Sequence, residues 1–215
     1  MTAVLVAAAL ALLVGGIGVL ARRFAWEAEV ARKASHVALG LAALPLPWLF
    51  RDDATVLMLA FAACAGLFAL RAIPALKARF GCALHGIARA SFGEFAFVGG
   101  VALAFVLAHD HPTAYVAAIL TLALGDTAAA LVGRSFGRHR FAVGRAHKSL
   151  EGSCAFFAVA AVVAAVLPDA LGVAAVAAFA LATTLAEALA GDGLDNAAIP
   201  LAGLLALRLF TGVSP

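Results

Sequence analysis

The stretch GDTAAALVGRSFGRHRFAVGRAHKSLEGS, residues 125–153, interrupts a chain that is otherwise almost unbroken Ala, Leu, Val and Phe. It places Asp126 inside apolar sequence, follows it with a basic loop, and ends on Lys148-Ser149-Leu150-Glu151-Gly152. An ionisable residue at membrane depth is costly and is usually kept for a function. The stretch therefore predicts a functional carboxylate beside a cationic loop, at one face of a membrane.

The composition supports a membrane protein. The chain has 215 residues, of which 65% are hydrophobic and 13% charged, and its mean hydropathy is +1.07. A soluble domain carries about 25% charged residues, so these apolar runs must face lipid. The formal net charge is only +3 and the basic residues are clustered. This pattern argues against nucleic-acid binding and favours anionic lipid headgroups and phosphates as partners.

The apolar runs predict an all-α fold, a polytopic integral membrane helix bundle in one transmembrane domain over residues 1–215. Because about 20 apolar residues cross a bilayer, we expect about eight transmembrane helices. Their approximate ranges are 2–21, 34–50, 54–70, 94–109, 113–133, 153–168, 170–190 and 195–213.

The basic residues lie in alternate loops of this arrangement. Successive loops must alternate between the two sides of the membrane. Of the 15 Lys and Arg residues, 13 then fall in three loops on the same side, and the other two are Arg51 and Arg208. The positive-inside rule then places both termini on the non-cytoplasmic side. We expect the protein to be integral to the cytoplasmic (inner) membrane, with its active site facing the cytoplasm. The expected cytoplasmic loops are 22–33, 71–93, 134–152 and 191–194.

Asp126 lies beside a face of small residues. Gly125, Ala129 and Gly133 repeat every four positions, which predicts close approach of another helix. An interhelical hydrogen bond would explain Asp126, but a buried charge favours a function. A carboxylate here suits Mg²⁺, which binds through one or two carboxylates together with substrate phosphates.

The loop that follows has the groups that bind phosphate. At a helix entrance, cation, hydroxyl and backbone donors together suit an anion. An N-cap at Ser149, with Glu151 complementing the helix dipole, is an alternative that could hold at the same time. The candidate phosphate-binding residues of this region are Gly133, Arg134, Lys148, Ser149, Glu151 and Gly152.

A second cluster opens the predicted helix 34–50. Arg32, Lys33 and His36 are three and four residues apart, so they share a helix face at the membrane boundary. The two cations favour a neutral imidazole that can accept a proton, and they are candidate phosphate ligands. Anchoring of the helix end by snorkelling side chains explains the same spacing equally well.

A third cluster combines Glu187 with Asp192, Asp195 and Asn196, ahead of Pro200. Pro200 cannot donate to the carbonyl of Asn196, so this oxygen is expected to be free for an ion or water. Helix capping by either aspartate is the alternative. Three carboxylates within nine residues, in a chain this poor in acids, favour metal or substrate binding.

Taken together, these blocks resemble the CTP-dependent lipid-alcohol kinases, a family of dolichol kinase, phytol and farnesol kinase and the fungal-type diacylglycerol kinase. The resemblance runs from residue 32 to about 201 and is most specific at the Lys-Ser-Leu-Glu-Gly block. The matching blocks are Arg32-Lys33-x-x-His36, Gly125-Asp126-Thr127, Gly133-Arg134-Ser135-Phe136-Gly137, Lys148-Ser149-Leu150-Glu151-Gly152-Ser153, Glu187-Ala188-Leu189 and Leu194-Asp195-Asn196 with Pro200.

The resemblance implies CTP as phosphoryl donor and a lipid alcohol as acceptor. It implies that Asp126 and Asp195 are Mg²⁺ ligands and that Asn196 is a nucleotide- or phosphate-binding residue. His36 and Glu187 are both candidates for the group that takes the hydroxyl proton. Phosphatidate cytidylyltransferase, a wider relative, is an alternative, although the sequence of residues 191–196 departs from its pattern. A small ion-coupled transporter is a third possibility, and the placement of the acids on one side counts against it.

Overall fold

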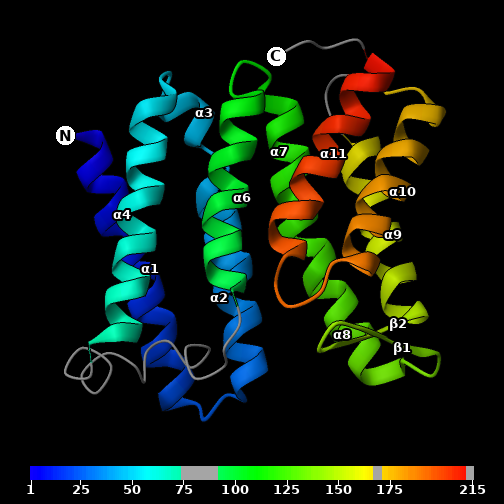
Figure 1. Ribbon diagram of the computed structural model, residues 1–215, viewed down its shortest axis with the longest axis horizontal. Helices are drawn as coiled ribbons and strands as arrows, with labels where there is room; N and C mark the ends of the chain where they lie inside the picture. The colour runs from blue at the N-terminus through cyan, green and yellow to red at the C-terminus, as the bar shows by residue number, and fades with distance from the viewer. Residues whose placement is uncertain (74–91, 167–170, 212–215) are drawn as a thin grey trace.

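The computed structural model describes residues 1–73, 92–166 and 171–211. These residues form a helix bundle with one two-stranded hairpin (Figure 1). Its elements are α1 (Thr2–Arg23), α2 (Ala28–Ala43), α3 (Leu46–Leu49), α4 (Asp53–Ala72), α6 (Gly93–Ala108), α7 (Pro112–Leu120), the π-helical segment η1 (Thr121–Gly125), α8 (Asp126–Phe136), β1 (Arg140–Val143), β2 (Ala146–Ser149), α9 (Leu150–Ala165), α10 (Val173–Leu189) and α11 (Asp195–Thr211).

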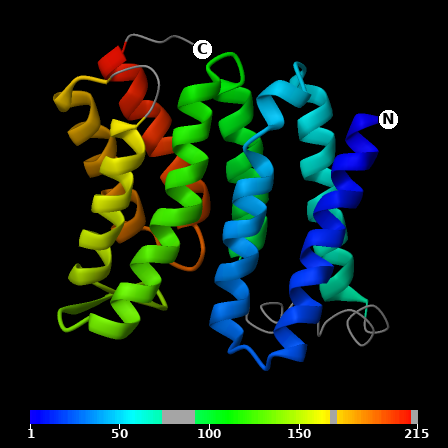
Figure 2. The same cartoon turned by 180° about the vertical axis from the view of Figure 1, so that it is seen from behind.

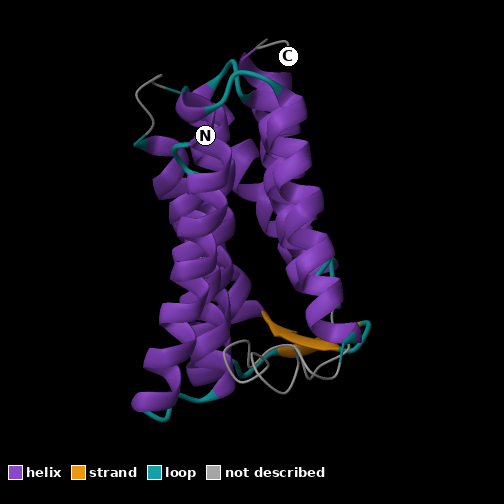
Figure 3. Ribbon diagram, turned by 90° about the vertical axis from the view of Figure 1, so that its left-hand side faces the viewer, coloured by secondary structure: helices purple, strands orange, loops and turns teal. Residues whose placement is uncertain are grey.

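The long helices run side by side. Helices α1 and α4 form one flank and α9 and α10 the other, with α2, α6, α7 and α11 between them (Figures 1 and 2). Helix α1 begins and α11 ends at the same end of the bundle. The opposite end, called here the hairpin end, holds β1, β2, the end of α8 and the α10–α11 turn (Figure 3).

Three stretches of the described chain are long and apolar enough to cross a membrane, namely Thr2–Arg23, Asp53–Ala72 and Pro112–Phe136. Helices α6, α9 and α10 are apolar but shorter. The side chains of α1 and α4 are largely uncovered, as Leu12 at 76% and Phe61 at 77% exposure illustrate. Exposed apolar surface on this scale is typical of helices that face lipid, so the structure is consistent with a helical membrane protein.

The packed core lies away from that flank, among α6, α7, α9, α10 and α11. Phe105, Tyr115, Phe156 and Phe179 are fully buried there. The hydroxyl of Tyr115 donates to the carbonyl oxygen of Ala43 at 3.0 Å, which satisfies a group at the end of α2. The elements that bear the polar clusters are therefore attached to the rigid part of the bundle.

The prediction of a helix over 34–50, preceded by a loop to residue 33, was wrong at both ends. Helix α2 begins at Ala28, so Arg32 and Lys33 lie in its second turn. It ends at Ala43, and Leu44 and Pro45 separate it from the short helix α3, whose second residue is Pro47. The charges of residues 27–33 suggested a loop, but Ala, Glu, Arg and Lys are good helix formers.

The predicted all-α fold class is confirmed, but the predicted loop over residues 134–152 contains a short hairpin and the ends of two helices. Helix α8 continues to Phe136, an antiparallel hairpin pairs Arg140 with Ser149 and Val143 with Ala146, and α9 begins at Leu150. Much of the predicted loop 71–93, with Lys77, Arg79 and Arg89, lies outside the described residues. The same is true of residues 167–170, where the predicted helices 153–168 and 170–190 meet, and of the last residues of the predicted helix 195–213.

Helix α6 crosses α11 at Gly100, and this contact leads to a prediction. A Cβ on Gly100 would lie 2.9 Å from the Cα of Ala197, a backbone atom that cannot move aside, whereas a Cβ on Gly99 would meet nothing within 4 Å. We expect Gly100→Ala to lower the free energy of unfolding by about 1–3 kcal/mol, as overpacking does. Gly99→Ala should leave it nearly unchanged, and SDS titration in mixed micelles followed by circular dichroism compares the two. Equal stabilities for the two variants would contradict the contact.

Candidate functional site

The first polar cluster joins α2 to the start of α8. The amine of Lys33 lies 2.6 Å from Oδ2 of Asp126 and also donates to the backbone oxygen of Asp126 at 3.0 Å. Both side chains are about nine-tenths buried. Because a buried charge is tolerated only with a partner, this ion pair explains how Asp126 stays ionised within the bundle.

His36, one turn further along α2, contacts the same region. Its Nε2 donates to the carbonyl oxygen of Leu122 at 3.1 Å and lies 3.4 Å from Oδ2 of Asp126. The ring packs edge-on against Phe97, with 5.0 Å between ring centroids. The structure therefore brings Lys33 and His36 of the second predicted cluster to Asp126.

The second cluster is centred on Lys148 and joins three elements. Its amine lies 2.8 Å from Oε1 of Glu187 and 3.2 Å from Oδ2 of Asp195, and it also donates to the backbone oxygen of Glu187. Ser153 donates to the other Glu187 oxygen at 3.2 Å. Burial lowers the pKa of Lys148, but Asp195 and Glu187 outweigh it, and the pKa is raised. Lys148 is thus a cation held between two carboxylates.

The hairpin positions Lys148. Its tip contains Gly144, whose φ of 58° lies in the left-handed region that favours glycine. A Cβ on Gly144 would lie 2.9 Å from Oδ2 of Asp192, so the tip lies directly against the α10–α11 turn. Arg145 reinforces this contact with an ion pair to Asp192 at 3.4 Å. The docking of the hairpin brings Lys148, on β2, to Glu187 and Asp195.

The glycine-rich residues around Ser149 serve helix packing. Oγ of Ser149 accepts from the backbone N–H of Gly152 at 3.1 Å, which confirms the predicted N-cap of α9. A Cβ on Gly133 would lie 2.9 Å from this oxygen, and one on Gly152 would lie 2.7 Å from the carbonyl oxygen of Ala129. Helices α8 and α9 therefore meet along the predicted small-residue face, where Gly125 likewise contacts Phe156.

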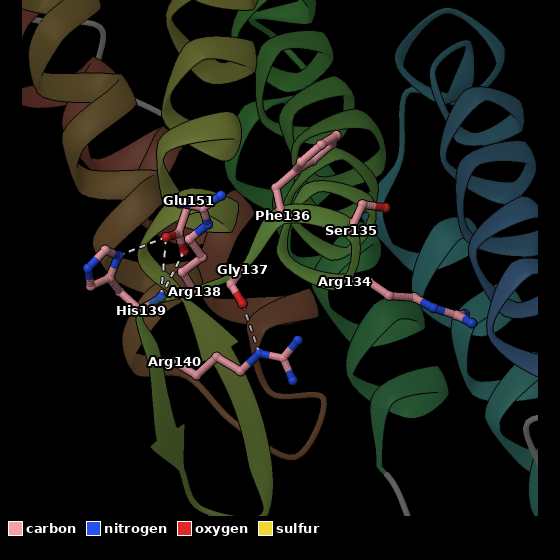
Figure 4. Close-up of a pocket in the computed structure, with 8 residues that line it drawn as sticks. All are labelled: Arg134, Ser135, Phe136, Gly137, Arg138, His139, Arg140 and Glu151. Atoms are coloured by element: carbon pink, nitrogen blue, oxygen red, sulfur yellow. Dashed lines mark hydrogen bonds and ion pairs between the residues drawn. The ribbon is translucent and has the colours of Figure 1, made fainter.

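A basic cleft of about 520 Å³ lies between the end of α8 and the hairpin (Figure 4). Glu151 is on its wall and accepts from Nδ1 of His139 at 2.8 Å. This bond holds the pKa of Glu151 at about 2, so the contact is present above the ordinary value of 4.5 and is lost only as the pH falls toward 2. The lining residues are Arg134, Ser135, Phe136, Gly137, Arg138, His139, Arg140 and Glu151.

The remaining candidate cations lie at the surface. Arg32 pairs with Glu29 on its own helix, with 2.6 Å between Nη2 and Oε1. Arg134 forms an exposed pair with Glu27 at 2.5 Å, which links the start of α2 to the last turn of α8. Surface pairs of this kind contribute little to stability, so both guanidinium groups can exchange their carboxylate for an anionic ligand at low cost.

Asn196 has a structural contact that the sequence did not predict. Its side-chain Nδ2 donates to the carbonyl oxygen of Gly93 at 2.8 Å, and its own carbonyl faces α6 at Gly100. The expectation that Pro200 leaves this carbonyl open to an ion or water was wrong, because α6 covers it. Asn196 ties α11 to α6 directly beside Asp195.

Sequence reasoning missed Ser153 as a partner of Glu187, Glu27 as a partner of Arg134, and His139 as a partner of Glu151. Of these three residues, only Ser153 could have been identified from the sequence, because it lies in the block that begins at Lys148. Within the described ranges, no group of three or more His, Cys, Asp or Glu side chains could hold a metal ion. Asp126 and Asp195 still offer the hard oxygen donors that Mg²⁺ takes together with phosphate oxygens.

The two clusters lie on neighbouring elements. Segment η1, which precedes Asp126, contacts α2, α9 and α11, and α9 and α11 in turn flank Glu187 on α10. Comparisons with protein-family models, curated proteins and solved structures found no match for this chain.

Proposed function

We propose that this protein is a membrane-embedded kinase that transfers the γ-phosphoryl group of CTP to the hydroxyl of a lipid alcohol. The observation that carries the proposal is the pair of buried lysine–carboxylate clusters, Lys33–Asp126 and Lys148–Glu187–Asp195, in a protein that also has a basic cleft at its hairpin end. The choice of CTP, and of a polyprenol, dolichol, phytol, farnesol or diacylglycerol as acceptor, rests on the sequence resemblance.

The proposed topology has eight membrane spans in the cytoplasmic membrane, with both termini on the non-cytoplasmic side and the hairpin end in the cytoplasm. Its support is the charge pattern, since most arginines and lysines of the chain belong to the loops assigned to that side. The apolar tail of the acceptor would remain in the bilayer, and its hydroxyl would meet the nucleotide at the cytoplasmic edge.

Catalysis of phosphoryl transfer consists mainly of positioning and of stabilising negative charge. Lys148 and Lys33 would donate to phosphate oxygens, with Arg32 and Arg134 available at the rim. A Mg²⁺ ion held by Asp126 and Asp195 would neutralise charge on the phosphates when bound. In the absence of ligand, the same carboxylates neutralise the lysines, so ligand binding amounts to an exchange of partners within each cluster.

The acceptor oxygen forms a bond to the γ-phosphorus as the bond to the β,γ-bridging oxygen breaks, and CDP and the lipid phosphate are formed. The hydroxyl proton must pass to a base. Glu187 suits this role better than His36, because it offers a carboxylate next to Lys148 whereas Nε2 of His36 already donates to a carbonyl. Because phosphoryl transfer passes through a loose transition state, a strong base is not required.

Position-specific labelling tests the proposal. Purified protein in nanodiscs with Mg²⁺ should transfer label from [γ-³²P]CTP to a lipid alcohol, and none from [α-³²P]CTP. Asp126→Asn should lower this transfer by about 10²–10³-fold, because the carboxylate acts on the phosphates. Asp110→Asn, in the exposed turn at the opposite end of the bundle, makes the same chemical change and should have no effect.

The other outcomes are equally clear. Transfer of the α-label to phosphatidate would identify a cytidylyltransferase and overturn the kinase proposal. If folded protein transferred neither label to any acceptor, an enzyme of this class would be excluded, and ion flux across proteoliposomes would become the measurement to make.

A further inference from the structure

We propose that α2 is a clamp that holds η1 in its π-helical form and thereby aims the carboxylate of Asp126. In this arrangement, His36 is a positioning residue and not the group that accepts the substrate proton. The inference rests on the proposed function only for its kinetic readouts.

The clamp is one face of α2. Lys33, His36 and Gly40 are spaced three and four residues apart, so they lie in a row along the helix. Lys33 holds the carboxylate and the backbone oxygen of Asp126, and His36 holds the carbonyl of Leu122. A Cβ on Gly40 would lie 2.5 Å from Cβ of Ala123, so the glycine lets α2 come this close to η1. All three contacts are to η1 or to the residue that follows it.

Segment η1 needs such a partner. A π-helical turn departs from the regular i→i−4 pattern of backbone hydrogen bonds and is frequently found at functional sites. Its carbonyls accept from side chains here, as Leu122 does from His36 and Ala123 from the hydroxyl of Thr127 at 2.8 Å. The hydroxyl of Thr121 is fully buried and has no hydrogen-bond partner within the described residues, which adds a cost to this conformation.

The consequence for Asp126 is geometric. It is the first residue of α8, directly after η1. Conversion of the π turn to a regular α-helical turn would change the rotation of the helix at this point and move the carboxylate away from Lys33. Contacts that fix η1 therefore fix the direction of the Asp126 side chain.

The hydrogen bond of His36 decides between the two roles. A carbonyl oxygen can only accept, so Nε2 of His36 carries the proton in this bond. The nitrogen that faces Asp126 and the phosphate site is therefore a donor, whereas a general base needs a free lone pair there. The edge-on contact with Phe97 holds the ring in this orientation.

Two amide substitutions separate the roles. The amide nitrogen of His36→Gln reaches the position of Nε2 and can donate to Leu122, whereas that of His36→Asn ends near Nδ1 and cannot. We expect His36→Gln to retain most of the wild-type kcat with an unchanged pH profile. His36→Asn and His36→Leu should lose about 10- to 100-fold in kcat with little change in KM for the lipid, as when a supporting contact is lost.

Hydrogen exchange gives a readout that does not depend on activity. In nanodiscs, His36→Asn should speed amide exchange in a peptide covering residues 119–129, relative to wild type and His36→Gln, and leave a peptide from α10 unchanged. This result would support the clamp even if wild-type protein transferred no phosphoryl group. The clamp is overturned if His36→Asn leaves exchange unchanged. It is also overturned if His36→Gln is as inactive as His36→Leu and if the dependence of its kcat on pH lacks an ionisation that the wild-type protein shows.

Discussion

Replacing Lys33 by Met should lower the free energy of unfolding by about 3–5 kcal/mol, the cost of leaving a buried charge without its partner. The side chains of Lys33 and Asp126 are 6% and 11% exposed, so little water can take the place of the amine. The backbone oxygen of Asp126 loses a donor as well. SDS titration of the purified protein in mixed micelles measures the change.

A double variant and a surface control make this test specific. Lys33→Met combined with Asp126→Leu should recover most of the lost stability, because a buried ion pair can often be replaced by apolar groups of similar size. Arg32→Met, at the neighbouring position, breaks an exposed pair with Glu29 and should cost less than about 1 kcal/mol. If Lys33→Met were as mild as Arg32→Met, Asp126 would not depend on this lysine.

Replacing Lys148 by Met should lower phosphoryl transfer by about 10²–10³-fold, the usual effect of removing one donor that stabilises charge in a transition state. The amine lies between Glu187 and Asp195, and its raised pKa keeps it charged at neutral pH. The loss should fall on kcat for the lipid alcohol, measured with [γ-³²P]CTP in nanodiscs.

Arg145→Gln is the matched control for Lys148, since it removes a cation from the same hairpin. Arg145 is exposed and pairs with Asp192 at 3.4 Å, away from Glu187. Transfer by Arg145→Gln should therefore stay close to wild type. Lys148→Arg keeps the charge in a different shape and should be intermediate. Full activity in a folded Lys148→Met variant would remove Lys148 from the catalytic site.

The sequence identified the residues of the two clusters, but not how these residues pair. The pattern of charged residues within apolar sequence led to Asp126, Lys33, Lys148, Glu187 and Asp195, because buried ionisable side chains in a membrane protein must find partners. The structure brings these five residues into two ion-paired groups. Which cation meets which carboxylate depends on helix packing, and spacing along the chain contains no information about that.

Two features could not be predicted from local patterns. The π-helical segment Thr121–Gly125 has the composition of any apolar helix, and its conformation depends on contacts with Lys33 and His36 from a helix about 90 residues earlier. The hairpin could not be predicted, because each of its strands has only four residues. The small-residue face of α8 was predictable, since helix geometry alone places Gly125, Ala129 and Gly133 in one row.

The two clusters differ in the order in which their charges are synthesised. Lys33 precedes Asp126 by 93 residues, so the counter-ion has already been synthesised when Asp126 is added to the chain. Lys148 precedes Glu187 by 39 residues and Asp195 by 47, so both of its carboxylate partners are synthesised only after α9. The first cluster can thus form before the second, which needs α9 and α10 to be complete.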